Sequence, residues 1–371
     1  SRISSAEANP EQSVYHEGTS PRIAAACLFL VLRSLDAART ESKLLRPAQV
    51  LFERERQLPD IPAVDHYAGS EKFMRRALAL QAEMGPVFDV TLDCEDGAPA
   101  GNEQAHAKMC AELAVSSENR HGRVGVRIHD LTHPHWLRDL ETILPIAAGR
   151  LAYLTVPKVR SARDVRTVRE AMRPLLPPGT RPPPLHVLIE TPEALAEVAR
   201  IAHEPGVECL DFGLMDFVSS HRGAIGAEAM RSPLQFEHPL IRRAKAEIAA
   251  AAHAATIVPA HNVCTELEDA SLVYADAHRA RTEFAFLRMW SIHPNQIRPI
   301  LEAMQPSAAE IEDAVRILTA AQDAAWGPIR DAGHLHDRAS YRYYWAVLQQ
   351  ARRTGIALAD EILHRFFGSE S

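Results

Sequence analysis

The chain has 371 residues, a formal net charge of −7 and a pI near 6.2. This acidic balance argues against a nucleic-acid or other polyanionic partner, although local basic residues can still bind an anionic ligand. Hydrophobic residues account for 46% of the chain and charged residues for 24%, which is typical of a soluble globular protein. The length suits one large domain with an appendage.

Cysteine usage and hydrophobicity indicate a cytoplasmic protein. The 5 cysteines are odd in number and show no CxxC spacing, which favours buried free thiols in a reducing compartment over a disulfide framework or a zinc site. The longest apolar run, which begins at Ile23, is too short to span a bilayer, and no convincing cleavage site follows it. We therefore expect neither a membrane partner nor secretion.

The first sixty residues differ from the rest of the chain. Residues 1–21 are polar and rich in turn-forming residues, which indicates partial disorder. A helical pattern then runs from Pro21 to Arg56, and Pro59 and Pro62 mark a boundary. We interpret residues 1–60 as an N-terminal extension.

Residues 61–305 alternate short apolar runs with longer helical segments. This rhythm predicts parallel strands that are covered on their faces by helices. Seven or eight such units fit an α/β fold of the (β/α)₈ TIM-barrel type better than an open doubly wound sheet, and no GxGxxG motif follows the first strand. The runs expected to form strands are 87–94, 124–128, 151–156, 185–189, 207–212, 255–259 and 286–292.

From residue 306 to residue 371 the pattern is purely helical. We expect helices within 307–326, 340–353 and 357–367, with a break at Gly327–Pro328 and a loop over 331–340. The chain therefore predicts a C-terminal helical extension on the barrel.

Polar side chains follow five consecutive predicted strands. The carboxyl ends of parallel barrel strands meet at the active-site face. Charges gathered at such a place are costly unless they pair or bind a metal, so their clustering indicates chemistry. In strand order they are Asp93 with Glu95 and Asp96, then Arg127, Lys158, Glu190 and Asp216.

Glu190 and Asp216 are the predicted metal ligands. Each follows a buried run and precedes a helical segment, so their carboxylates are expected to converge. Carboxylate oxygens suit a hard cation such as Mg²⁺, with Mn²⁺ as an alternative. The competing interpretation is that both acids cap helix N-termini, and Thr191–Pro192 would itself start a helix well.

Arg127 has a fixed bidentate fork, which suits a substrate carboxylate or a developing enolate, and it could also pair with Glu95 or Asp96. Lys158 could bind the same anion or serve the scaffold; a Schiff-base role is less favoured beside a metal pair. His293 lies at the last strand end, where we favour a structural role.

Six blocks of the sequence, in order, resemble the citrate lyase beta-subunit-like family, which includes the malyl-CoA and citramalyl-CoA lyases. They lie between about Val64 and the C-terminus. The blocks LDCEDG, VRIHDLTHP, VPKV, IETPEAL, FGLMDF and SIHPNQI resemble the family's LDLEDA, VRIN, LPKV, IETA/GL, FGAEDL and IHPNQI.

The resemblance implies a (β/α)₈ barrel with a C-terminal helical lid in a homotrimer or hexamer. It implies that Glu190 and Asp216 bind Mg²⁺ and that Arg127 contacts the substrate. Glu95 and Asp96 match the family's acidic pair, which orders water around the metal. In the family a Gly-x-x-x-Asp segment of the lid closes over a neighbouring subunit's site, which makes Asp337 the candidate acid/base in trans; an N-cap role for it is the alternative.

One block departs from the family. The family's first strand ends in FVPGxRP, whose Arg helps to bind the nucleotide part of CoA. The corresponding stretch here is DHYAGSEKF, which keeps Gly69 and offers Lys72 nearby but lacks the Arg. These two residues and Lys158 are the candidate contacts for a cofactor-like CoA group.

Three functions remain open from the sequence. The first is a Mg²⁺-dependent carbon–carbon lyase that cleaves a β-hydroxyacyl-CoA of the malyl, citramalyl or citryl type to a 2-oxo acid and an acyl-CoA, by a retro-Claisen-type scission. The second is a Mg²⁺-dependent aldolase that acts on free 4-hydroxy-2-oxo acids, which the missing Arg favours. The third is a non-catalytic acyl-binding subunit.

Overall fold

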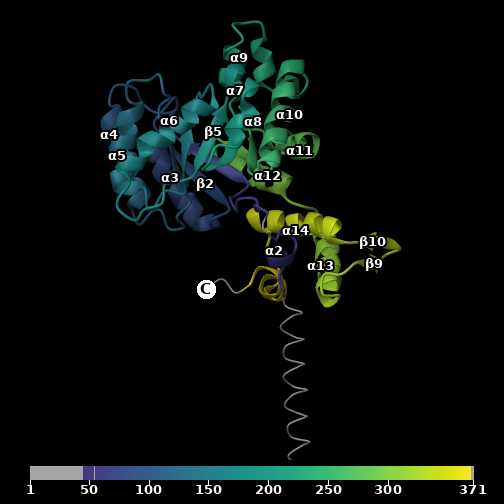
Figure 1. Cartoon of the computed structure of the whole chain (residues 1–371). Coiled ribbons are helices and arrows are strands. Elements are labelled where there is room, and N and C mark those ends of the chain that lie inside the picture. Colours follow the sequence, from purple (N-terminus) through teal and green to yellow (C-terminus); the bar gives the residue numbers. More distant parts are fainter. Residues whose placement is uncertain (1–44, 54, 369–371) are drawn as a thin grey trace, which may run out of the picture.

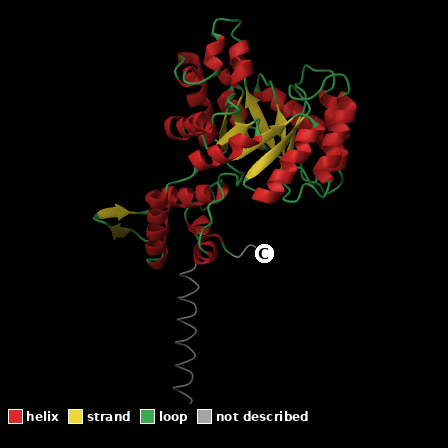
Figure 2. Cartoon of the chain, turned by 180° about the vertical axis from the view of Figure 1, so that it is seen from behind, coloured by secondary structure: helices red, strands yellow, loops and turns green. Residues whose placement is uncertain are grey.

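Eight parallel strands close into a barrel in their sequence order, β1 to β8, with β8 pairing back onto β1. The computed structural model describes residues 45–53 and 55–368. Figure 2 shows the strands at the centre of the molecule, ringed by helices. The barrel strands are Val64–Ala68, Phe88–Asp93, Val124–Arg127, Tyr153–Val156, Leu185–Ile189, Val207–Phe212, Val258–His261 and Arg288–Ser291.

Helices fill the connections between the strands, as the alternating pattern predicts. Their starts follow local chemistry: the Ser161 side chain and Asp164 form a capping box, and Thr191 accepts from the Ala194 N–H ahead of Pro192. The helices are α3 (Glu71–Met84), α4 (Glu103–Val115), α5 (Trp136–Ala147), α6 (Ala162–Met172), α7 (Pro192–Ala196), α8 (Val198–Ala202), α9 (Leu214–Ser219), α10 (Pro239–Ala254), α11 (Ala270–Phe284) and α12 (Pro294–Met304), with short 3₁₀ turns at Arg173–Leu175, Ala227–Met230 and Leu234–Phe236.

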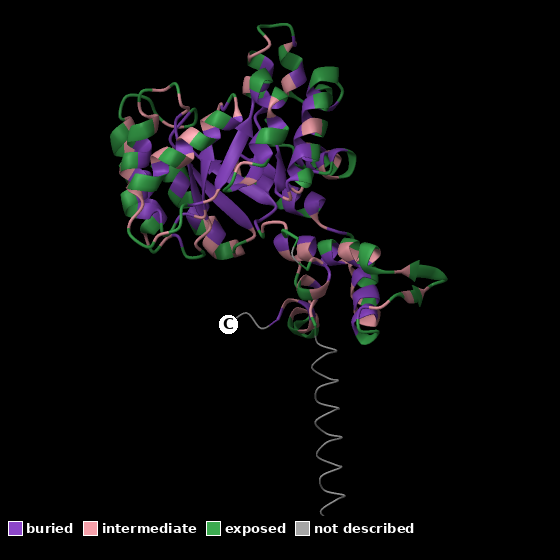
Figure 3. Cartoon of the chain, in the orientation of Figure 1, coloured by how far each residue is buried: buried purple, intermediate pink, exposed green. Residues whose placement is uncertain are grey.

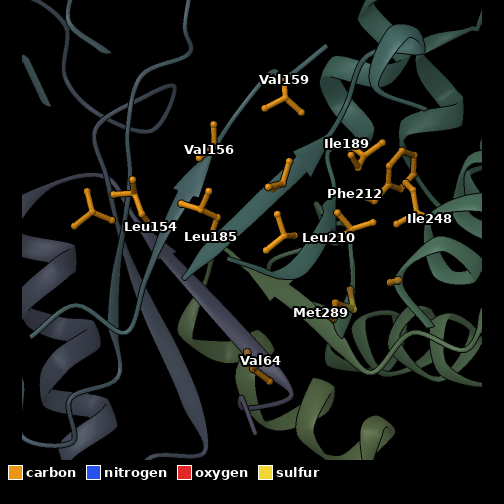
Figure 4. Close-up of a cluster of buried hydrophobic side chains, with 14 of the residues drawn as sticks. Val64, Leu154, Val156, Val159, Leu185, Ile189, Leu210, Phe212, Ile248 and Met289 are labelled. Carbon is orange, nitrogen blue, oxygen red and sulfur yellow. The ribbon is translucent and has the colours of Figure 1, made fainter. Parts of the chain in front are cut away.

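The main hydrophobic core lies between the strands and the surrounding helices. The strands are buried along nearly their whole length (Figure 3). Phe212 of β6 and Ile248 of α10, for example, are both fully buried in this layer (Figure 4). The (β/α)₈ prediction is therefore confirmed. Only the first strand, Val64–Ala68, was not among the apolar runs, because its VDHYA sequence carries two polar residues.

The interior of the barrel is partly polar. Arg288, fully buried at the start of β8, pairs with Asp65 at 2.8 Å and with Asp89 at 2.7 Å. Arg123 adds a second ion pair to Asp89 at 2.7 Å. We call Asp65, Asp89, Arg123 and Arg288 the lower network, because all four lie at the amino-terminal ends of the strands. Its charges are matched in number, which offsets the cost of their burial.

Both ends of the described chain form a separate helical unit beside the barrel (Figure 1). Leu51 is buried in the same hydrophobic cluster as Ile317 and Leu348. We therefore propose that residues 45–60 belong with residues 306–368 and that 61–305 form the barrel domain. The unit comprises α2 (Pro47–Val50), α13 (Ala308–Asp323), α14 (Arg338–Arg353), α15 (Asp360–Ile362) and a π-helical turn at Leu363–Phe367.

The C-terminal extension is not purely helical as expected, because the segment expected to be a loop contains two short strands. Strands β9 (Ile329–Asp331) and β10 (His334–His336) form an antiparallel hairpin there, which projects away from the helices (Figure 1). Ala332 and Gly333 both have positive φ, which is the backbone of a two-residue type I′ turn.

Several sequence predictions fall partly outside the described residues. Of the helical pattern from Pro21 to Arg56, only α2 is described, and Cys27 lies outside as well. The other cysteines are buried and unpaired, as expected. Within the described residues, no helix combines the length and apolarity needed to cross a bilayer.

Candidate active site

A cavity of about 550 Å³ opens at the carboxyl ends of the barrel strands. Side chains that follow several different strands reach it, which is how barrel enzymes assemble their sites. Among the residues singled out from the sequence, seven line this one cavity: Gly69, Asp93, Asp96, Arg127, Glu190, Asp216 and His293. These strand-end side chains therefore lie around one cavity, as the sequence predicts.

Glu190 follows β5 directly, and its carboxylate is almost fully buried at the cavity. Oε1 accepts the backbone N–H of Lys158 at 2.6 Å, whereas Oε2 has no hydrogen-bond partner among the described residues. Gly213 makes room for this side chain, since a Cβ at that position would lie 2.2 Å from Oε2. Burial, followed by the charges of Asp216 and Glu95, raises the pKa of Glu190 to about 8.

Asp216 lies in the first turn of α9 and is more exposed than Glu190. Burial also raises its pKa, against the opposing effect of the Lys158 charge, whose Nζ lies 3.9 Å from Oδ1. The alternative that the two acids are helix caps is wrong: Thr191 and Gly213 occupy the N-cap positions of α7 and α9. The carboxylates are left facing the cavity.

Arg127 ends β3 and is fixed by Asp93, which ends β2. The pair is bidentate, with Nε at 2.7 Å from Oδ1 and Nη2 at 2.6 Å from Oδ2. Nη1 lies 3.1 Å from Oε2 of Glu95 in an ion pair, and the N–H groups not bonded to Asp93 remain for a ligand. Burial alone would raise the pKa of Asp93, but the charge and hydrogen bonds of Arg127 lower it overall.

Lys158 joins the acidic residues together. Its ammonium group bonds to Glu95 and to Asp96, the latter at 2.7 Å. Burial lowers its pKa less than these hydrogen bonds and charges raise it, so the group stays cationic. Its backbone has φ of 47°, a left-handed conformation that turns its N–H toward Glu190. Of the two roles left open for Lys158 by the sequence, anion binding and scaffold support, these contacts with protein carboxylates match the scaffold role.

The cavity also has an apolar wall that sequence reasoning missed. The rings of Tyr67 and Trp290 stack at 4.3 Å on its floor. Phe73, Met215 and Ile292 line it while 62%, 39% and 44% exposed, which is unusual for such large apolar side chains. Their position on helices and loops gave no signal in the sequence, because only the closed barrel shows which helix face looks over the cavity.

The basic residue at the rim is Arg76, not Lys72. Both lie on α3, one turn apart, but only Arg76 lines the cavity. No ion pair of Arg76 exists within residues 45–53 and 55–368, so its charge is available to a ligand. The KFMRR sequence places both basic residues on one face of α3, because residues i and i+4 share a helix face, but it does not distinguish which of them reaches the cavity.

Two other predicted residues have capping contacts. Asp337 is the N-cap of α14, where Oδ1 accepts from the Ala339 N–H at 3.0 Å, and it does not line the cavity of its own chain. His293 caps α12 through Nδ1, which accepts from the Asn295 N–H at 3.2 Å, and it also lies at the cavity edge. The structural role favoured for His293 is therefore present.

Residues 75–292 match the HpcH/HpaI aldolase/citrate lyase family. The chain belongs to this family. It is accordingly an enzyme of the carbon–carbon lyase class, and the sequence resemblance to the citrate lyase beta-like enzymes is confirmed.

Two named relatives indicate which activities are assigned to proteins similar to this chain. An L-malyl-CoA/beta-methylmalyl-CoA lyase of Cereibacter sphaeroides is 30% identical over 278 residues, which cover 71% of this chain and 86% of that protein. A (3S)-malyl-CoA thioesterase of the same species is 29% identical over 249 residues, with 66% and 79% covered.

Solved structures share the fold. A citrate lyase from Burkholderia xenovorans is 53% identical, superposes with a TM-score of 0.74, and matches 87% of this chain and 100% of its own. The protein CitE of Mycobacterium tuberculosis, solved with magnesium, acetoacetate and coenzyme A, has 22% identity and a TM-score of 0.60, with 79% and 98% covered.

Proposed function

We propose that this enzyme is a Mg²⁺-dependent lyase that cleaves a β-hydroxyacyl-CoA of the malyl-CoA type to a 2-oxo acid and an acyl-CoA. The observation that carries the proposal is the juxtaposition of Glu190 and Asp216 in one cavity with the pre-oriented guanidinium of Arg127. Relatives named malyl-CoA lyase support the thioester class of substrate.

The donor set fits a hard divalent cation. Glu190 is a buried carboxylate whose Oε2 has no hydrogen-bond partner among the described residues, and the nearby Asp216 raises its pKa further. Two carboxylates supply oxygen ligands, and the remaining positions of a Mg²⁺ ion are normally filled by water and substrate. Solved structures of the CitE protein contain magnesium. Mn²⁺ has the same preference for oxygen ligands.

A bound cation would supply Lewis-acid polarisation of the hydroxyl and carboxylate oxygens of the substrate. Arg127 would then hold the enolate oxygen of the departing acyl group with N–H groups that Asp93 does not engage, and its ion pair with Asp93 keeps the fork in place. Glu95 and Asp96, held by Lys158, would order water at the metal. The bond that breaks joins the carbinol carbon to the carbon next to the thioester, and the carbinol O–H proton passes to water in the cavity as the 2-oxo group forms.

The carbon that departs must gain a proton, for which we propose Asp337 of a neighbouring subunit. Asp337 lies outside its own cavity, beside the exposed hairpin residue Leu335, so a partner chain in a homotrimer or hexamer is the source that fits. The exposed apolar rim of Phe73, Met215 and Ile292 would be covered by the same lid. We also propose a cytoplasmic location.

The rim distinguishes a CoA thioester from a free acid. A small 2-oxo acid needs only the metal and Arg127, whereas Arg76 and Phe73 lie at the outer part of the cavity, where a nucleotide-bearing thioester would extend. We therefore favour the CoA ester over the free-acid aldolase. The Arg76→Gln variant should raise KM for the thioester several-fold with kcat unchanged, because Arg76 would bind only the remote phosphate groups.

The direct test measures products from malyl-CoA, citramalyl-CoA, citryl-CoA and free 4-hydroxy-2-oxo acids with Mg²⁺. Formation of a 2-oxo acid and an acyl-CoA, lost in Asp216→Asn and kept in the exposed control Glu193→Gln, is the expected result. Formation of free CoA and the hydroxy acid would instead assign the thioesterase activity of the second relative. Turnover that persists in EDTA would contradict the metal role.

Subunit complementation tests the lid. Asp337→Ala and Asp216→Asn chains are each expected to be inactive, and their co-expression should restore part of the activity because some interfaces then combine two intact residues. Failure of restoration in an oligomer shown to be mixed would place Asp337 outside the reaction.

A further inference from the structure

A second cluster of metal-ligating side chains lies outside the cavity, between β2 and α4. Cys94 directly follows β2, and His106 and Cys110 lie one turn apart on the same face of α4. One ligand atom from each of the three lies within 4.8 Å of the other two. Both cysteines are buried, with exposures of 1% and 0%, and His106 is half-buried.

The distance between the sulfurs matches a zinc site. Cys94 Sγ and Cys110 Sγ are 3.7 Å apart. Two thiolates bound to one tetrahedral Zn²⁺ at about 2.3 Å lie about 3.8 Å apart. This distance is well beyond the length of a disulfide, about 2.05 Å. No local pattern predicts this cluster, because the ligands have no CxxC spacing and are brought together only when α4 packs on β2.

The histidine is oriented as a metal ligand would be. Its Nε2 lies 2.8 Å from the backbone oxygen of Asp93, and because a carbonyl only accepts, Nε2 carries the hydrogen and Nδ1 keeps its lone pair. Ligating histidines commonly donate their second N–H to a backbone carbonyl in this way. The ring is thus fixed with one nitrogen available for coordination.

We propose that Cys94, His106 and Cys110 bind one Zn²⁺ ion, with water in the fourth position. Two sulfurs and one nitrogen select a borderline-soft metal, in contrast to the all-oxygen set at Glu190 and Asp216. The half-buried His106 gives the fourth position its access to solvent.

This ion would stabilise the loop that carries Glu95 and Asp96. The Cys94 N–H donates to the Arg127 carbonyl at 2.9 Å, and the Asp93 carbonyl accepts from His106. The zinc site is therefore coupled through the backbone to the Asp93–Arg127 pair. Its role is structural support of the site, separate from the chemistry of the cavity.

The test uses the full-length protein, first as purified without chelators for zinc content, and then stripped and titrated with Co²⁺ in excess Mg²⁺. We expect about one zinc per chain and, with Co²⁺, a thiolate-to-cobalt charge-transfer band together with tetrahedral d–d bands. Cys110→Ser should lose the zinc and weaken the band, whereas the matched control Cys264→Ser, a buried cysteine elsewhere, should keep both. Excess Mg²⁺ keeps Co²⁺ off the carboxylates, which give no thiolate band in any case.

The His106→Gln variant separates a loss of metal binding from a folding defect, because its half-buried side chain is the least costly of the three to replace. It should weaken Co²⁺ binding at least about tenfold, since even the outer partners of metal ligands are worth that much, while the circular dichroism spectrum stays unchanged. Three results would overturn the proposal: no thiolate band at saturating Co²⁺, equal zinc in wild type and Cys110→Ser, or a wild-type mass lower by two hydrogens that a reductant restores, which would reveal a disulfide.

Discussion

Charged side chains gather at two levels of the barrel, and the two groups differ in how their charges are matched. In the lower network, two aspartates face two arginines: Arg288 contacts Asp65 and Asp89, and Arg123 contacts Asp89. The upper cluster lies at the carboxyl ends of the strands and has more acids than bases. It consists of Asp93, Glu95, Asp96, Glu190 and Asp216, with Arg127 and Lys158 as the cations that pair with these acids.

This difference separates structural charge from functional charge. A buried ion pair that is matched in number holds elements in place without any further partner. Burial, followed by the charges of Asp216 and Glu95, instead raises the pKa of Glu190 to about 8, and a bound cation would favour its ionised form. Acids that share one cavity mark the site better than buried acid alone, because burial also raises the pKa values of Glu208 and Asp211 to about 7, and neither lines the cavity.

The Glu190→Gln variant, in the upper cluster, should lose turnover without losing stability, and this is the largest effect that we expect. We expect turnover to fall by about a thousandfold or more, because the neutral amide is a weak ligand and the metal's contribution to the transition state is lost. The metal-free variant should unfold at or above the wild-type temperature, since a costly buried acid is removed. Steady-state kinetics with saturating Mg²⁺ and thermal unfolding measure the two effects; near-normal turnover would contradict the assignment.

The Arg288→Met variant, in the lower network, should lose stability but keep its turnover. It leaves Asp65 and Asp89 buried without their shared partner, so the free energy of unfolding should fall by about 3–5 kcal/mol. Urea titration measures this loss, with Arg298→Met on the exposed face of α12 as the control. At low temperature the folded variant should keep most of its turnover, because the lower network does not line the cavity. A loss of activity without loss of stability would contradict a structural role for the lower network.

The affinity for Mg²⁺ should depend on pH in one direction. Burial raises the pKa of Glu190, so below about pH 8 the carboxyl is protonated and a proton must leave when the cation binds. Affinity should therefore rise about tenfold per pH unit from pH 6 to pH 8, and level off above it. Calorimetry on the substrate-free protein measures the slope. Glu190→Gln should remove it, and a wild-type slope of zero would show that Glu190 is not the ligand.

Arg127→Lys should have the smallest effect of the four. Lysine keeps the charge but cannot form the bidentate contact with Asp93, so its orientation toward the cavity is lost. We expect kcat/KM to fall about tenfold, chiefly through kcat. A fall confined to KM would mean that the residue binds substrate and transition state equally.

The sequence predicted most of the architecture because its signals are local. Alternating apolar runs and helical segments directly reflect a barrel, and an acid that follows a strand must lie at its carboxyl end. Glu190 and Asp216 could thus be placed in one cavity before any coordinates. For Asp337 the sequence left two roles open, an acid/base in a neighbouring site and an N-cap. The N-cap contact is present, and the role in a neighbouring site stays a prediction.

What was missed depends on contacts between distant segments. Asp65 and Arg288 are far apart in sequence, and no local pattern shows that they pair inside the barrel. Arg76 could not be preferred over Lys72 until the orientation of α3 was known. The β9–β10 hairpin was hidden because its strands are three residues each and its turn, Ala332–Gly333, lacks the usual Asn-Gly signal.

The helical unit is attached to the barrel by two separate stretches of chain. Residues 55–63 enter β1 from α2, and residues 305–307 leave α12 for α13. Asp60 also pairs with Arg353 at 3.2 Å, which fastens the first stretch to α14. Arg281 of α11 also pairs with Glu310 of α13 at 3.7 Å, and Gln350 of α14 donates to the Met304 carbonyl of α12 at 3.2 Å. Chain connections and side-chain contacts thus present the hairpin at a set position relative to the cavity of its own barrel.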